Sequence, residues 1–279
     1  MNADKFNTER PSWGRAEQEG SCKAFNFEFL LCVFAALCRR FSFVIRVYLR
    51  LSAVAVLLAA VSPAWAILPI QHWQTAGGAR VYFVENRDLP MLDVSVEFPA
   101  GAGYDRPETA GLAAMTNRLL SAGADGMNED EISRRMADVG AQHGGRFDTD
   151  RAGFMLRTLS SDRERREALD VFARVLRAPA FPQEVLDREK ARLTGALKEA
   201  DTRPDTIASR AFYRLAYRDH PYALRASGEV ETIGKIARED LVGFHRRHYV
   251  APYAVVAIMG DVTRAQAEAI AEQLTRGLP

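Results

Sequence analysis

Cysteine is scarce in this chain and confined to its first part. Of 279 residues only three are cysteines, Cys22, Cys32 and Cys38. A disulfide framework, a thiolate nucleophile and a cysteine-based metal site are therefore excluded from everything downstream of residue 38. An excess of charge of one sign is also lacking, since 37 Lys and Arg face 36 Asp and Glu for a net charge of +1. That balance gives no reason to expect a nucleic-acid partner.

The amino-terminal region has the pattern of an export signal. Two arginines precede an apolar run over 51–61, and Ala64 and Ala66 supply the small residues that a signal peptidase reads. The run is shorter than the roughly 20 apolar residues of a membrane span. We expect cleavage after Ala66, a mature chain that starts at Ile67, and a periplasmic or secreted location.

A second apolar stretch, over 29–38, precedes this signal. Two apolar stretches are unusual for a signal peptide. One interpretation is that 1–66 comprises a signal peptide with an extension from a start assigned too early, with translation beginning near Val44 or Val47. The other interpretation is a retained segment that anchors the protein in the inner membrane. A membrane partner is expected only in that second case.

Apolar periodicity predicts one mixed domain over 67–279. Alternation of apolar and polar residues, or a short apolar run, predicts strands at 80–85, 92–98, 141–147, 153–159 and 254–259. Helical spacing predicts helices at 109–121, 129–139, 163–177, 183–200, 206–217, 239–248 and 264–276. Because strands and helices do not alternate strictly, we expect an α+β fold: an antiparallel sheet with helices mainly on one face.

Residues 111–123 resemble the zinc-binding helix of the pitrilysin/insulinase-like (inverzincin) metallopeptidases. That family carries His-x-x-Glu-His there. In this sequence the two histidine positions fall on Ala114 and Arg118, and the catalytic glutamate falls on Asn117. The family's third ligand, seven residues after a Glu-Arg or Glu-Lys pair, falls on Ala196. The resemblance therefore implies a chain with no catalytic residue, no metal ligand and no cofactor.

Elementary chemistry agrees with that implication. A catalytic zinc needs three protein ligands of nitrogen, sulfur or carboxylate type. Alanine offers no donor atom, and a guanidinium is a permanent cation. Arg118 about 4 Å from a divalent ion would cost roughly 8 kcal/mol at an effective dielectric of 20. The alternative is an ordinary core helix that has no connection with metal, with Ala113, Ala114 and Leu120 buried.

Further matches to the family follow in its order along the chain. They lie at 95–103, 108–111, 131–140, 148–150, 220–222, 228, 240–244, 249, 252 and 260–262. The resemblance spans 71–279 and is to one amino-terminal half-domain, similar to that of a processing-peptidase-type subunit. It implies that the family's second half-domain is missing here.

With no zinc ligand and no general base expected, the function left for such a chain is peptide binding without hydrolysis. In the family, substrate lies extended along an edge strand, and the resemblance places that strand at His143, Gly144, Gly145, Arg146, Phe147 and Asp148. We expect a non-catalytic partner subunit of a homologous periplasmic zinc peptidase with an intact motif, with peptides as ligands. The alternatives are a stand-alone peptide-binding or scaffold protein and, less favoured, an active zinc metalloendopeptidase.

The histidines suggest one other site. His245 and His248 are three apart on an expected helix and could face one way with His143 or His220, which would form a different metal centre. The neighbouring arginines favour a solvated helix surface instead.

Overall fold

The structure, a computed structural model, describes residues 45–52 and 69–279. Residues 45–52 are helical and belong to a first unit, 1–66, while the second unit, 67–279, holds the domain. The expected cleavage point at Ala66 and the apolar stretch 29–38 lie outside the described residues. Within those ranges, no helix has the length and apolar character needed to cross a membrane.

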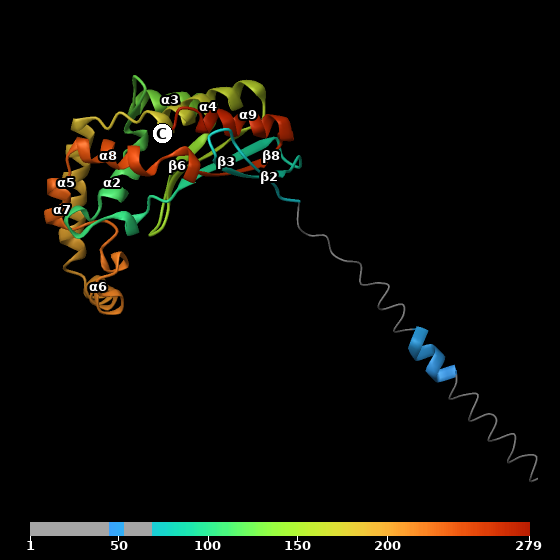
Figure 1. The fold of residues 1–279 in the computed structure, drawn as a ribbon, viewed down its shortest axis with the longest axis horizontal. Coiled ribbons are helices and arrows are strands. Elements are labelled where there is room, and N and C mark those ends of the chain that lie inside the picture. The colour runs from blue at the N-terminus through green and yellow to red at the C-terminus, as the bar shows by residue number, and fades with distance from the viewer. Residues whose placement is uncertain (1–44, 53–68) are drawn as a thin grey trace, which may run out of the picture. The chain divides into compact units, whose positions relative to one another are not determined.

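A six-stranded sheet forms the centre of the domain (Figure 1). Its order is β1, β2, β8, β3, β7, β6. The strands are β1 (Gln71–Gln74), β2 (Arg80–Glu85), β3 (Met91–Phe98), β6 (Gln142–Phe147), β7 (Ala152–Leu159) and β8 (Val255–Gly260). Every pairing is antiparallel except β2 with β8. The expected antiparallel sheet is thus confirmed with one parallel pair, which the long crossover between β2 and β8 permits.

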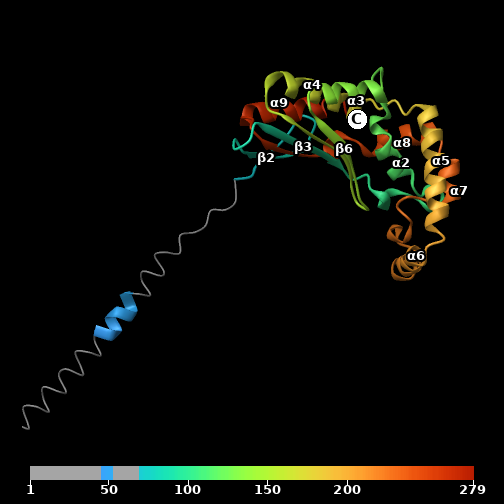
Figure 2. The ribbon, with the colours of Figure 1, turned by 180° about the vertical axis from the view of Figure 1, so that it is seen from behind.

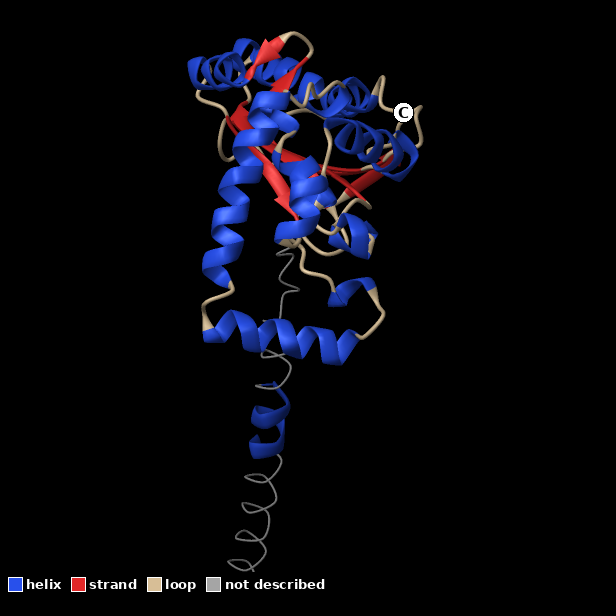
Figure 3. Ribbon diagram, turned by 90° about the vertical axis from the view of Figure 1, so that its left-hand side faces the viewer, coloured by secondary structure: helices blue, strands red, loops and turns tan. Residues whose placement is uncertain are grey.

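The sheet buries one face. Along β3, residues alternate between half-buried and buried, and along β7 they alternate between buried and exposed from Phe154 onward. Helices α4 (Asp162–Arg177) and α9 (Arg264–Thr275) pack on the buried face (Figure 1). Figure 3 shows the molecule turned by 90°, with helices in blue and strands in red. Phe172 and Leu176 of α4 are fully buried there, and each such side chain contributes about 1.5–3 kcal/mol by leaving water. The expected placement of helices mainly on one face is confirmed.

The other helices of the domain are α2 (Leu112–Arg118), α3 (Glu129–Asp138), α5 (Gln183–Ala200), α6 (Pro204–Tyr217), α7 (Val230–Lys235) and α8 (Arg238–His248). Of these, α3 packs against α4, and the rest lie toward one end of the sheet (Figure 1). The helix expected over 109–121 is shorter, because Gly111 has a φ of 93° and blocks helix on its amino-terminal side. Single 3₁₀ turns, Pro107–Thr109 and Leu120–Ala122, flank α2.

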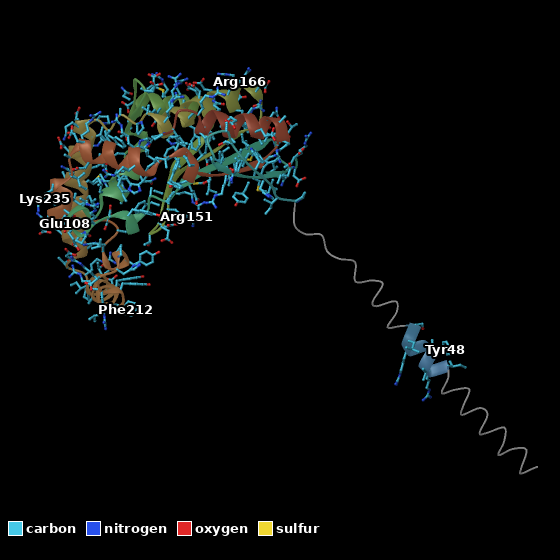
Figure 4. The ribbon with its side chains drawn as sticks, in the orientation of Figure 1. Tyr48, Glu108, Arg151, Arg166, Phe212 and Lys235 are labelled. Carbon is cyan, nitrogen blue, oxygen red and sulfur yellow. The ribbon has the colours of Figure 1, made fainter. Side chains whose placement is uncertain are left out.

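Helix α6 extends away from the body of the domain (Figure 2). It has no buried residue, and Phe212 is 65% exposed; Figure 4 shows Phe212 at the outer edge. Arg210 anchors the helix through ion pairs with Asp201 and Glu229. Ion pairs and the packing of Tyr217 on Tyr222, with ring centroids 5.6 Å apart, therefore hold α6 in place without burying any of its residues.

A buried carboxylate fixes the start of α2. Asp105 accepts hydrogen bonds from the N–H groups of Gly111 at 2.8 Å and Ala113 at 3.0 Å. These satisfy two donors that a helix start leaves open. Burial raises the pKa of Asp105 to about 6, against the lowering effect of the two hydrogen bonds. The ionised carboxylate is thus less favoured in the folded protein than in the unfolded chain.

The substitution Asp105→Asn tests this assignment. Because the folded pKa lies above the unfolded value of 3.8, the contribution of Asp105 to stability is full below pH 3.8 and is lost as pH rises through about 6. The loss is about 3 kcal/mol, from 1.36 kcal/mol per pKa unit. The asparagine variant should lack this pH-dependent loss of stability. The free energy of unfolding in urea, measured for both proteins between pH 4 and 7, tests this. Parallel stability profiles would contradict the assignment.

Candidate functional site

A pocket of about 390 Å³ lies where α2, β6 and α5 meet. Ala114, Asn117 and Arg118 line it from α2, and Gly145 lines it from β6. The three α2 residues share one helix face because they are three and four positions apart. The structure therefore places these three sequence-predicted positions in one pocket, beside the strand expected to bind peptide.

Asn117 is buried, and its amide nitrogen is fully engaged. Its Nδ2 donates to the carbonyl of Gly153 at 2.8 Å and to the hydroxyl of Tyr249 at 3.3 Å. A neutral amide has no basic lone pair to accept a proton at neutral pH. Asn117 therefore connects α2 to β7 and to Tyr249, and it offers no general base to the pocket.

Strand β6 carries a glycine where α2 approaches it most closely. A Cβ atom on Gly145 would lie 2.6 Å from Oδ1 of Asn117, whereas a Cβ on the adjacent Gly144 would meet nothing within 4 Å. Heavy atoms at 2.6 Å overlap strongly, so the contact between helix and strand requires glycine at position 145 and not at position 144.

Arg118 forms an ion pair with α5. Its Nε donates to Oε2 of Glu189 at 2.6 Å, and Nε of Arg192 donates to the same oxygen at 3.0 Å. Partial burial alone raises the pKa of Glu189, but the hydrogen bonds and charges of the two arginines lower it below its usual range. Glu189 is therefore ionised at neutral pH and pairs with two arginines, of which only Arg118 lines the pocket.

Ala196, the expected third-ligand position, does not line the pocket. It is exposed on α5, while Leu193, one turn earlier on that helix, lines the pocket instead. Sequence reasoning used Glu189 only to count to position 196 and missed its ion pair with Arg118. Its separation from Arg118 by 71 residues leaves no local signal in the sequence.

The expected peptide-binding residues form the edge of the sheet. Strand β6 is last in the strand order and pairs with β7. His143 packs on Phe154 with ring centroids 5.5 Å apart, and burial lowers the pKa of His143. Phe147 also lines the pocket. Asp148 instead closes the turn after β6, accepting from the N–H of Arg151 at 2.7 Å.

The alternative histidine site is wrong. His245 is buried, with Nε2 2.9 Å from the carbonyl oxygen of Leu176, and its ring stacks on Tyr249 at 4.9 Å. Burial lowers its pKa. In the part of the chain that the structure describes, no three His, Cys, Asp or Glu side chains are placed to hold a metal. The competing expectation of a solvated surface also fails at His245, because this side of α8 faces the core.

These features define a class: an α+β domain with an open edge strand beside a pocket. Comparison with known families then identifies the family within this class. Residues 80–229 match the family model described as Insulinase (Peptidase family M16), and 235–279 match Peptidase M16 inactive domain. The chain belongs to peptidase family M16. Its match to the inactive domain supports a non-catalytic peptidase homologue.

Curated relatives include proteins from mitochondria. The chain is 24% identical over 199 residues to a probable mitochondrial-processing peptidase subunit beta of Arabidopsis thaliana, covering 71% of this chain and 36% of that protein. It is also 24% identical to cytochrome b-c1 complex subunit 1 of Bos taurus, covering 70% and 40%. The chain thus spans well under half the length of these two relatives.

Solved structures share the fold. A peptidase M16 inactive domain from Pseudomonas fluorescens matches with a TM-score of 0.74 and 37% identity, over 76% of this chain and 51% of that one. The periplasmic protease PqqL from Escherichia coli matches with a TM-score of 0.67 and 14% identity, over 75% and 24%. The second likeness shows the fold alone.

The close contact between α2 and β6 gives a prediction for stability. Gly145→Ala should destabilise the protein by about 1–3 kcal/mol, because the added methyl group overlaps Asn117 and must displace it. Gly144→Ala, on the same strand, is the matched control and should change stability by less than about 0.5 kcal/mol. Denaturant unfolding of both variants measures the difference.

A second background shows whether Asn117 is the cause. In Asn117→Ala protein the methyl group of Gly145→Ala has room, so the added cost of that substitution should be at least halved. An equal cost in both backgrounds would contradict the steric explanation.

Proposed function

We propose that this chain is a non-catalytic subunit that binds extended peptides for a homologous zinc peptidase. The observation that carries the proposal is the edge strand β6 beside a pocket to which α2 contributes Ala114, Asn117 and Arg118. Alanine has no polar side-chain atom, the asparagine amide is neutral, and the arginine guanidinium is permanently positive. None of these three side chains is therefore a usual zinc ligand or a general base. The arrangement supports binding and supplies no means of activating water.

Strand addition is the binding mode that β6 supports. The outer side of an edge strand presents N–H and C=O groups to which an extended peptide can pair. Gly144 has open space beside its Cα atom, which leaves room on that face of the strand for a side chain of the bound peptide. Alternate side chains of the bound peptide would then point toward the pocket.

The open face of the sheet supports a partner subunit. Tyr82, Met155, Leu159 and Met259 are each more than 40% exposed there, and they come from strands β2, β7 and β8. Apolar side chains on one exposed face favour burial against another protein. A stable interface would bury well over about 1,000 Å² in total.

An exported location accompanies this proposal. It is supported by the apolar run over 51–61 and by Ala64 and Ala66. We expect a processed periplasmic protein whose first residue is Ile67, and amino-terminal sequencing of the exported form checks it. Recovery of an unprocessed chain from the membrane fraction would instead favour the anchored form.

The partner role predicts activity only in a mixture. The chain alone should not cleave peptides, whereas a homologue with an intact His-x-x-Glu-His motif should cleave faster when this chain is added, because the added subunit holds substrate. Peptide cleavage by each protein and by the pair, with co-elution on a sizing column, measures this.

Zinc content is the control for the chain alone. After dialysis it should hold no stoichiometric zinc, since Ala114 and Arg118 offer no ligand; one zinc per chain would contradict the non-catalytic assignment. Equal cleavage rates with and without this chain, together with separate elution, would reject the partner role. Retained peptide binding in that case would favour a stand-alone binding protein, since β6 and the pocket lie within one domain.

A further inference from the structure

Arg118 has donors that the protein itself does not use. Its Nε is bound to Glu189, and among the residues described no acceptor is paired with Nη1 or Nη2. The side chain is 53% exposed and lines the pocket. Two guanidinium N–H groups therefore remain for a ligand, in the planar arrangement that suits a carboxylate.

The charge around the pocket favours an anion. Arg118 and Arg192 share the single carboxylate of Glu189, so this cluster has a net charge of about +1 from formal charges. Glu189 is mostly buried, with a side chain 15% exposed, and lies behind the guanidinium as a fixed support. An ion-paired arginine held in this way loses less rotational freedom on binding than a mobile one.

The pocket walls fit a side chain or terminus that ends in a carboxylate. Leu193, Phe147 and Phe154 supply apolar surface for a hydrocarbon stem. The hydroxyls of Ser121 and Ser227 also line the pocket and are hydrogen-bonded to no residue within 69–279. Hydroxyl groups can donate to a carboxylate oxygen.

We propose that this pocket selects peptides through a carboxylate bound by Arg118. The carboxylate belongs either to an acidic side chain of the bound strand or to its carboxyl terminus, and the chemistry is the same. The inference rests on the proposed function, peptide binding at β6, and adds a preference for acidic ligands to it.

Three kinds of labelled nine-residue peptide of alternating Ala and Thr test the preference. The first kind has a Glu and an amidated terminus, the second a central Gln and a free terminus, and the third a central Gln and an amidated terminus. The first kind is made in two versions, with Glu at the central position or at the next one, because alternate side chains face opposite sides of a strand. Fluorescence anisotropy at low salt should give the Glu peptide or the free-terminus peptide an affinity about fivefold above the third.

Two variants separate direct contact from the general field. Arg118→Gln should abolish the preference. Arg192 contacts the same Glu189 oxygen as Arg118 does but does not line the pocket. Arg192→Gln removes one positive charge, as Arg118→Gln does, and should nevertheless keep most of the preference. Glu189→Gln should act in the opposite direction and raise affinity for the Glu peptide, because it removes the negative charge beside Arg118 while the glutamine oxygen can still accept from Nε.

The outcomes distinguish the two levels of proposal. Equal affinity for all three kinds of peptide would overturn the carboxylate preference and leave peptide binding standing. Failure of every peptide to bind would overturn both. Equal loss of preference in Arg118→Gln and Arg192→Gln would overturn direct recognition by Arg118. Thermal unfolding of each variant confirms that the protein tested is folded.

Discussion

The packing of α2 against β6 and β7 is the contact on which the pocket depends. The amide of Asn117 joins α2 to the carbonyl of Gly153 and to the hydroxyl of Tyr249. Tyr249 is itself fully buried and packs on Phe98 with ring centroids 4.8 Å apart. Because an unsatisfied buried polar group costs about 1–3 kcal/mol, this one side chain constrains a helix, a strand and the end of α8 together. Gly145 then allows the strand to come close enough to form the pocket wall.

Both ends of α2 are held by charged side chains. A helix of seven residues is not stable in isolation, since helix formation in water needs about 12–15 residues even in favourable sequences. The carboxylate of Asp105 accepts from the first turn, and Arg118 at the last turn pairs with Glu189 of α5. The same ion pair that holds the helix end also positions the guanidinium toward the pocket. Structural support and a candidate binding group are thus parts of one arrangement.

Most of the fold could be predicted from local pattern. The expected strands recur within a residue because one face of the sheet is buried and the other is not. Strand β1, with the sequence QHWQ, was missed because four residues give too little alternation. The parallel pairing of β2 with β8 was missed because it joins residues from opposite ends of the domain. Within the site, the resemblance singled out Ala114, Asn117 and Arg118, which all line the pocket, whereas counting along α5 led to Ala196, which does not line it.

The sequence alone determined which chemical groups are present: family-specific motifs in order, and Ala114, Asn117 and Arg118 where the family carries ligands and a base. These are properties of single residues and of short spacings, which the chain carries before it folds. Only the tertiary structure decided that Arg118 pairs with Glu189, that His245 faces the core, and that β2 pairs in parallel with β8. Each of these depends on the packing of segments far apart in the chain, because burial and ion pairing are set by which surfaces meet.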